Sequence, residues 1–366
     1  MELVISSKHH ICNISTALDV TGREHLVVIA KATWKIPAPN QRPKPIQPSP
    51  LCTSDEYYGA PGESAMRYGD DFARFKPRCD VIFDSVAYAP DNRPARFVDV
   101  AVQVGTMKKR IQVVGPRKWE RGLIGVVPGS PEPFTRMPLH YGFAFGGMRP
   151  YRYKGETLCD VLEDNPVGIG WAGAHTWHKM IGQSAPNLEH PKHPVRSPEG
   201  KNTPIALSAI APAWPSRLQF GGTFDEAWRH DVAPFMPDDF DERYHQCAPD
   251  DQQIDYPQGG EEVILQNIVE SYSLLKFRLP PLANMKVRIL RKDYSVEELD
   301  APADTLFFET EKQRFSAIWR ASTPIHKRLQ EFDLIAVGGV NPQWWQARRL
   351  GIDGEGCAGC SRTSIA

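Results

Sequence analysis

The chain has 366 residues, and its 43 basic and 44 acidic residues give a formal net charge of −1. This balance argues against nucleic-acid binding, because nucleic-acid-binding domains usually carry a basic excess or stripe. A chain of this length should bury about 75% of the surface that its unfolded form exposes, so it needs neither a disulfide nor a metal for stability.

Proline is unusually frequent, with 33 residues, or about 9% of the chain against a usual ~5%. Proline has no amide donor and shortens helices. The composition therefore favours a β-rich protein with long, stiff, irregular connections.

The first 125 residues contain several strand signals. Alternating and β-branched residues predict strands at 25–36, 79–89, 96–105 and 109–115. Short polar links separate the last three, which predicts an antiparallel meander.

Strand signals return after residue 260. The predicted strands are 262–268, 273–279, 285–290, 304–310 and 314–321. A three-residue link joins the last two, which predicts a hairpin.

Residues 126–259 have a different character. Seventeen of the 33 prolines fall between Pro128 and Pro257, and strand signals are sparse. Short helices are predicted at 224–230 and 238–246. A long irregular stretch inside a compact domain is usually functional when it is ordered.

We therefore predict a mainly β fold in which antiparallel sheets pack as a sandwich-like body, with a few short helices. A single domain over residues 1–325 would combine the strand-rich parts 1–125 and 260–325 with the irregular part 126–259. We predict a C-terminal helical segment at 326–351, where Asn341 can cap a helix and Gly351 can end it. Residues 352–366 are predicted to be a flexible tail.

The chain shows no feature of export or membrane insertion. Its N-terminus has no apolar stretch of signal-peptide length, and no run approaches the ~18 apolar residues of a membrane span. The seven cysteines are odd in number and mostly scattered, unlike a secreted disulfide framework. We predict a reduced, cytoplasmic protein without membrane or nucleic-acid partners.

The stretch "PFMPDDFDERYHQCAPDDQQ" (234–253), here called the acidic segment, concentrates carboxylates beside one His and one Cys. An EF-hand calcium loop starting at Asp239 would place Tyr244 where the turn needs Gly and Asp250 where a bidentate Glu belongs, so that pattern fails. Two acids within 238–251 could serve a carbohydrate-active hydrolase. Asp and Glu also cap short helices and satisfy loop donors. Partner binding is the third interpretation.

Four residues are weak candidates for a metal site. Cys357 and Cys360 form one C-x-x-C pair, and His10 and Cys12 could complete a four-ligand zinc site if the termini met. The sequence lacks a phosphate-binding Walker loop, a nucleophile elbow and an H-E-x-x-H helix. We therefore expect no cofactor, and the missing motifs argue against catalysis without excluding it.

Several segments, taken in order, resemble a bacterial family that was once a domain of unknown function and is encoded beside toxins of the type VI secretion system. They spread over residues 20 to about 325. The matching segments are "VVIAKATWKI" (27–36), "YYGAPGESAMRYGDDFARFKPRCDVIF" (57–83), "MPLHYGFAFGG" (137–147), "NPVGIGW" (165–171), "APNLEHP" (185–191), "FGGTFDEAW" (220–228) and "PDDFDERYHQCAPDDQ" (237–252).

The resemblance implies a non-catalytic adaptor or chaperone in the bacterial cytoplasm. Its partners would be a toxin effector and the secretion spike, a valine-glycine-repeat protein capped by a PAAR tip. A hydrolase using acids of 238–251 stays open as the alternative.

Two groups of residues are candidates for partner binding or for organising the loops that carry it. Tryptophan is enriched at interface hot spots, and charge-assisted hydrogen bonds pin irregular backbone. The candidate anchors are Trp171, Trp177, Trp214 and Trp228, and the candidate loop organisers are Asp239, Asp241, Arg243, Asp251 and Gln252.

Overall fold

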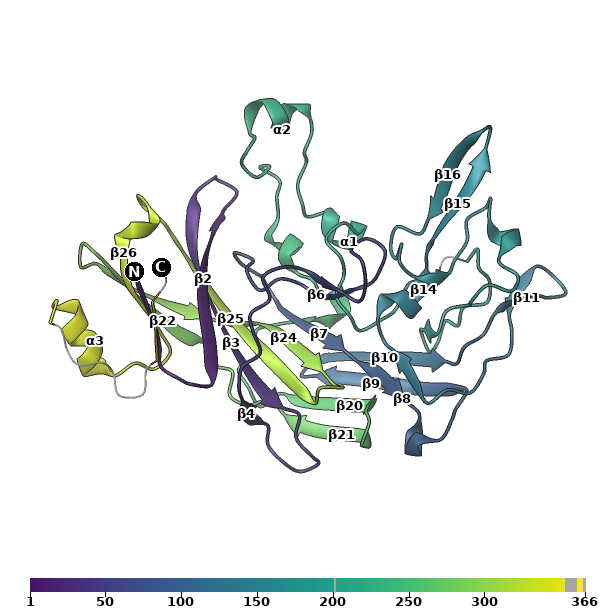
Figure 1. The fold of residues 1–366 in the computed structure, drawn as a ribbon, viewed down its shortest axis with the longest axis horizontal. Coiled ribbons are helices and arrows are strands. Elements are labelled where there is room, and N and C mark those ends of the chain that lie inside the picture. Colours follow the sequence, from purple (N-terminus) through teal and green to yellow (C-terminus); the bar gives the residue numbers. More distant parts are fainter. Residues whose placement is uncertain (201, 353–360, 365–366) are drawn as a thin grey trace.

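The computed structural model of the chain describes residues 1–200, 202–352 and 361–364. Within them strands far outnumber helices, and most strand pairs are antiparallel, which confirms the predicted mainly β class. Figure 1 shows the strands spread along the long axis of the molecule, with α2 standing out from one side. Three sheets hold most of the strands, and we call them the terminal, central and distal sheets.

The central sheet joins the two strand-rich parts of the chain. β3 and β25 pair antiparallel from Lys35–Arg314 to His25–Pro324, so the beginning and end of the predicted domain share one sheet. β24 and β25 form the predicted hairpin. In spatial order the strands are β19 (Gln253–Ile254), β7 (Cys79–Asp84), β24 (Ala303–Glu309), β25 (Arg314–Pro324), β3 (Glu24–Lys35) and β2 (His10–Leu18), and β4 (Lys44–Ile46) also pairs with β3.

The distal sheet corrects the predicted meander. Only β9 and β10 pair as predicted, whereas β7 lies in the central sheet, parallel to β24. The physical reason is that Cys79–Phe83 is fully buried, as befits an inner strand, whereas β9 buries only alternate residues. The order is β18 (Leu188–Glu189), β10 (Met107–Val114), β9 (Phe97–Val104), β20 (Glu262–Val269) and β21 (Tyr272–Arg278); β8 (Val86–Tyr88) pairs separately with β13 (Arg136–Pro138).

The terminal sheet brings the two ends of the chain together. The predicted terminal helix is present as α3 (Pro342–Arg349), and the Asn341 side chain caps it. The segment 326–351 also contains a buried strand, so it is not helical throughout, and Ser361–Ser364 in the predicted flexible tail forms a strand that pairs with β1. The order is β23 (Val296–Ala301), β22 (Met285–Arg291), β26 (Phe332–Val337), β1 (Glu2–Ile5) and β27 (Ser361–Ser364).

The proline-rich middle segment (126–259) is built from short elements, and part of it shares a small core with the strand just before it, β11 (Trp119–Arg121). Trp119 and Phe145 are the largest fully buried side chains of that core. Gly170 is required there: its φ is +86°, and a Cβ would lie 2.5 Å from Pro186. The elements are β11 (Trp119–Arg121), β12 (Val126–Pro128), β14 (Phe145–Gly146), β15 (Met148–Tyr153), β16 (Glu156–Val161), β17 (Ile169–Gly170), α1 (Pro215–Leu218) and α2 (Glu226–Asp231).

The remaining described elements are small. The strands β5 (Glu56–Tyr57) and β6 (Met66–Tyr68) pair with each other. The 3-10 turns are Pro90–Asn92, Tyr141–Phe143, Trp177–Lys179, Glu242–His245, Asp250–Gln252 and Leu329–Glu331. Of the helices in the described ranges, none combines the length and apolar character needed to cross a membrane.

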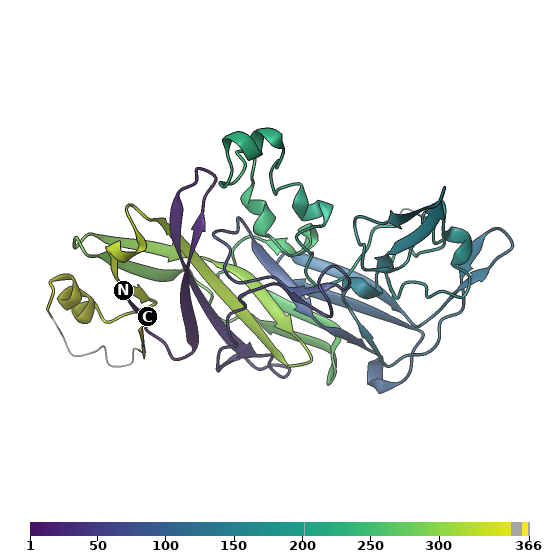
Figure 2. The same ribbon diagram turned by 45° about the horizontal axis from the view of Figure 1, so that its top comes forward.

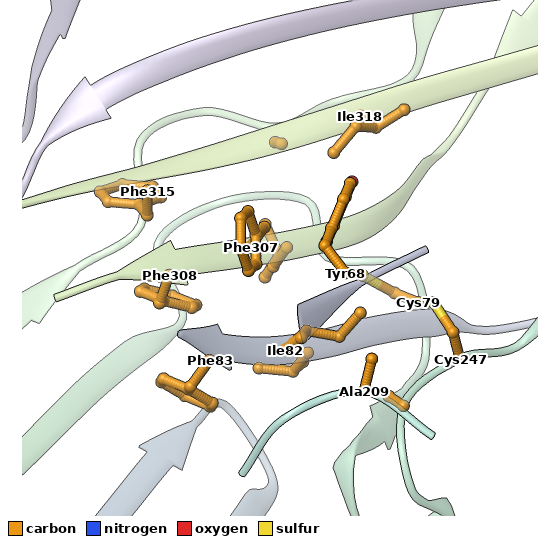
Figure 3. Close-up of a cluster of buried hydrophobic side chains, with 14 of the residues drawn as sticks. Tyr68, Cys79, Ile82, Phe83, Ala209, Cys247, Phe307, Phe308, Phe315 and Ile318 are labelled. Atoms are coloured by element: carbon orange, nitrogen blue, oxygen red, sulfur yellow. The ribbon is translucent and has the colours of Figure 1, made fainter. Parts of the chain in front are cut away.

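The main hydrophobic core runs through all three sheets and includes part of the middle segment. Figure 3 shows Phe307, Phe308 and Phe315 of the β24–β25 hairpin in this core, together with Ala209 and Cys247 from the middle segment. The middle segment is therefore packed into the sheet body and is not a separate appendage.

Candidate functional site

The middle segment builds a projection on one side of the molecule. Residues 220–240, here called the knob, carry α2 away from the sheets, as Figure 2 shows from a second angle. Two of its aromatic side chains, Phe224 and Phe235, are 60% and 47% exposed. The knob therefore exposes apolar side chains to solvent next to the short helix α2.

Local hydrogen bonds hold the knob in shape. At its base, Asp239 accepts bonds from the backbone N–H and the hydroxyl of Thr223 (2.9 and 2.7 Å). Across its tip, Nε1 of the predicted anchor Trp228 donates to the Phe235 carbonyl (3.0 Å), and the half-buried Trp228 ring meets Phe224 edge-on. Two of the candidate residues, Trp228 and Asp239, thus make hydrogen bonds within this projection.

The next turn is organised by an exposed ion pair. The Asp241 side chain caps the 3-10 turn Glu242–His245 by accepting from the Arg243 N–H (2.9 Å), and it also pairs with the Arg243 guanidinium (2.6 Å). The guanidinium lies over the Phe220 ring. The hydrogen bond from Arg243 lowers the pKa of Asp241, and the hydrogen bond from Thr223 likewise lowers the pKa of Asp239. Both groups are therefore carboxylates at neutral pH.

The end of the acidic segment is held from below by Asp80 of β7, which is fully buried. One Asp80 oxygen accepts from the Gln246 amide (2.6 Å) and the Ala248 N–H (3.2 Å). The other accepts from the Cys247 N–H (2.9 Å) and from Lys76 Nζ (2.8 Å). Burial alone would raise the pKa of Asp80, but Lys76 and the backbone donors outweigh it and lower that pKa.

A second buried contact holds the following turn. The Gln252 amide donates to the Val81 and Leu207 carbonyls (2.7 and 3.1 Å) and accepts from Lys109 Nζ (2.9 Å). Lys109 also pairs with Asp251 (2.9 Å). Burial lowers the pKa of Lys109, and Asp251 offsets part of that effect. Asp251 and Gln252, both candidate loop organisers, thus tie this turn to buried groups of the sheets.

A groove of about 760 Å³ opens beside these contacts. The predicted anchor Trp214 is buried in its wall, where its ring meets Tyr141 edge-on (5.1 Å). Arg217 braces the wall by donating to the Ile210 and Tyr244 carbonyls (2.8 and 3.1 Å). The described lining residues are Lys109, Tyr141, Asp164, His190, His193, Asn202, Thr203, Pro204, Ile205, Ile210, Trp214, Ser216, Pro249, Asp250 and Asp251.

The groove, the knob and the acidic segment all lie in a stretch that one bacterial family model covers. The model, described as "Uncharacterized protein conserved in bacteria (DUF2169)", matches residues 21–320. The chain belongs to the DUF2169 family. It matches no curated protein and no solved structure.

The other predicted site residues that the structure describes in this DUF2169 protein are not part of the groove lining. Trp171 and Trp177 are half-buried and pack on the small core of the middle segment. His10 and Cys12 lie on β2, whereas Cys357 and Cys360 are outside the described residues. The described ranges contain no group of three or more His, Cys, Asp or Glu side chains that could hold a metal ion.

The sequence analysis did not identify three buried residues that fix the groove wall and the end of the acidic segment to the rest of the protein. Asp80, Lys109 and Arg217 come from outside the acidic segment, and each is at least 90% buried. A signal was present for Asp80, because a charged residue inside the apolar strand "CDVIFD" needs a buried partner. Lys76, the partner of Asp80, lies four residues earlier in the sequence. The loop that Asp80 holds lies more than 160 residues later.

Three of the acids considered for a hydrolase, Asp239, Asp241 and Asp251, have local partners. A glycosidase needs two carboxyl groups across a substrate, one of them with a raised pKa so that it can act as an acid. In this DUF2169 protein, Asp239 and Asp241 bind local partners that lower their pKa, and Asp251 is paired with Lys109. These three carboxylates therefore make contacts that shape the surrounding loops.

Proposed function

We propose that this DUF2169 protein is a non-catalytic adaptor that binds a type VI secretion toxin and helps to load it onto the spike. The observation that carries the proposal is the platform formed by the groove and the knob. Its loops are irregular, yet buried polar contacts at Asp80 and Gln252 fix them to the sheets. The type VI link itself comes from the sequence resemblance.

A fixed platform suits an adaptor on physical grounds. Binding costs less free energy when the loops of the interface are already ordered, because less conformational entropy is lost. The groove offers Trp214 and Tyr141 on one wall, and the knob adds exposed apolar surface at Phe224. Specific interfaces commonly bury about 1,600 Å² in total. The groove and the knob together would supply part of that buried area.

Co-purification tests the proposal directly. The tagged protein is expressed with the products of the genes that neighbour its own, and bound proteins are identified by mass spectrometry. We expect a toxin, with the spike or PAAR-tip protein, to be retained. If the folded protein retains neither, the proposal fails.

Two matched pairs of variants locate the contact. Phe224→Ser on the knob should weaken retention at least tenfold, whereas Phe97→Ser, which alters a 53% exposed ring on the distal sheet, should not. Asp250→Lys in the groove is compared in the same way with Glu270→Lys in the turn after β20. Equal retention by all four variants would place the interface elsewhere.

A secretion assay separates an adaptor from a structural part of the machine. Deleting an adaptor should abolish export of one toxin while the sheath still fires and other substrates leave the cell. Loss of all export would instead indicate a structural component.

A further inference from the structure

The outer edge of the central sheet is formed by β2, which is drawn in dark purple in Figure 1. β2 pairs with β3 in unbroken register from His10–Ala32 to Leu18–Glu24. No strand of the described ranges pairs with its other side. Every residue of β2 is half-buried or exposed, so the edge is open to solvent.

The sequence of this edge lacks the usual protection. Exposed edge strands in soluble proteins are generally short, bulged, charged or interrupted by proline, because their unpaired backbone groups recruit other chains. β2 is nine residues long, reads "HICNISTAL", and contains no Lys, Arg, Asp, Glu or Pro. Its pairing with β3 shows no bulge.

The other outer strands of the three main sheets, where the side chains are described, are protected. β18 and β19 are only two residues long. β4 contains Lys44 and Pro45, β21 contains Lys276 and Arg278, and β23 contains Glu297, Glu298 and Asp300. The protein thus follows the general rule at these edges and departs from it at β2.

The open edge has unused hydrogen-bonding capacity. In an antiparallel strand, alternate residues direct their N–H and C=O groups away from the paired neighbour. Outside the β2–β3 ladder, the described residues make no backbone–backbone hydrogen bond to 11–18. The Ile14 N–H donates to the side chain of the adjacent Asn13 (2.9 Å), and the Thr16 carbonyl accepts from the Ser15 hydroxyl (3.4 Å). An incoming strand could replace these local contacts.

A cavity of about 460 Å³ lies along the first half of this edge. β1 contributes Leu3 and Ile5, and β2 contributes the residues from His10 to Asn13. Lys8 is the one Lys, Arg, Asp or Glu among the described lining residues. The cavity leaves room for side chains of an added strand, and its lining favours uncharged ones.

We propose that β2 receives an extended, largely uncharged segment of a partner polypeptide as an additional strand. Main-chain hydrogen bonds would supply affinity, and the cavity beside β1 would select side chains. The inference rests on the proposed adaptor function, since it names the chemistry of one contact with the loaded protein. β2 (His10–Leu18) ends before residue 21, where the family match begins, so the proposed contact lies outside the part of the chain that the family model covers.

A peptide titration tests the edge without any natural partner. The probe is a fluorescein-labelled eight-residue peptide of alternating Thr and Val, ending in Lys and N-methylated at every second residue, so that it has one pairing edge. The control peptide is N-methylated at every residue. We expect fluorescence anisotropy to show sub-millimolar binding of the probe alone, and no binding at 1 mM would overturn the proposal.

A matched pair of variants assigns that binding to β2. Thr16→Lys adds a charge to the open edge and should weaken binding at least tenfold. Ser273→Lys makes the same kind of change on the outer strand β21 and should leave binding unchanged. Equal weakening by both, or by neither, would contradict the assignment.

Hydrogen exchange and light scattering distinguish the other occupants. The outward amides of β2 should exchange fast in a monomeric free protein. Slow exchange in a monomer would mean that the chain covers its own edge, and a dimer that Thr16→Lys dissociates would mean that a second copy does. Either result overturns the proposal.

The partner complex separates this inference from the proposed function. If a toxin co-purifies while β2 amides stay unprotected and Thr16→Lys retains it, the inference fails and the adaptor function stands. If the peptide binds β2 but no toxin or spike protein co-purifies, the adaptor function fails and the edge site stands.

Discussion

The two halves of the acidic segment use the same residue types in opposite surroundings. Asp239 and Asp241 lie on the surface. Asp239 binds Thr223, sixteen residues before it, and Asp241 binds Arg243, two residues after it. The loop 246–252 is instead fixed by Asp80 and Gln252, which are fully buried. The position of a carboxylate in the sequence therefore says little about how much its contact stabilises the folded protein. That contribution depends on burial, because solvent screens exposed charges.

The largest effect should come from Asp80. Replacing it with Ala removes the acceptor for three groups of the loop and leaves the buried Lys76 charge without its partner. Breaking one side of a buried pair costs about 3–5 kcal/mol. Urea unfolding should show a loss of that size, and a loss below ~1 kcal/mol would contradict this account of the loop.

The Asp80 contact should also make stability depend on pH. The pKa of Asp80 is lowered in the folded protein, so its stabilising effect is complete above the unfolded pKa and is lost as pH falls through the folded pKa. The difference in unfolding free energy between the natural protein and Asp80→Ala should therefore shrink as the solution is acidified below about pH 4.

Gln252→Ala should have the next largest effect. It removes the side-chain donor to the Val81 carbonyl and one partner of Lys109, whereas the Leu207 carbonyl keeps its bond from the Phe83 N–H. Each unsatisfied buried group costs about 1–3 kcal/mol, so we expect about 2–3 kcal/mol in all. Gln253→Ala, one residue further, is the control, and a similar loss there would mean that the turn is generally sensitive.

His245 should make the protein less stable in mild acid. Burial, followed by the nearby Arg320 and Lys76 charges, lowers its pKa to about 3. The unfolded chain takes up a proton near pH 6.5 while the folded chain does not, so stability falls as pH drops. Between pH 7 and 5 this group should cost about 2 kcal/mol.

Urea unfolding of His245→Gln at the same two pH values measures that contribution. The variant should lose about 2 kcal/mol less than the natural protein on acidification. His178→Gln, at an exposed position, should change nothing. An unaltered pH dependence in His245→Gln would show that the imidazole takes up its proton over the same pH range in the folded and unfolded chains, and would contradict this account.

Asp241→Ala should have the smallest effect. Asp241 and Arg243 are 37% and 58% exposed, and surface ion pairs contribute about 0–1 kcal/mol. Even with its capping bond lost, the change should stay near 1 kcal/mol. A loss as large as that of Asp80→Ala would erase the contrast between the two halves of the segment.

The sequence was more informative about residues that contact their near neighbours in the chain than about residues that hold distant loops. Trp228, Asp239 and Asp241 act within the stretches that contain them, so patterns in those stretches revealed them. Asp80 and Lys109 act on a loop more than 140 residues away. Asp80 was at least a lone charge between apolar residues, whereas Lys109 lies between Lys108 and Arg110, where nothing marks it as buried. The meander failed for a related reason: β7 pairs with β24, and strand signals do not reveal partners.

By itself the sequence determined that the protein is mainly β, where most of its strands lie, and that its proline-rich middle carries the distinctive loops. Those properties follow from side-chain periodicity and from the missing amide of proline, which act within a few residues. Only the tertiary structure decided which carboxylates are buried, that β2 forms an open edge, and that the chain termini share a sheet. Burial and strand pairing depend on residues far apart in the chain, and their free energies exist only once the sheets have packed.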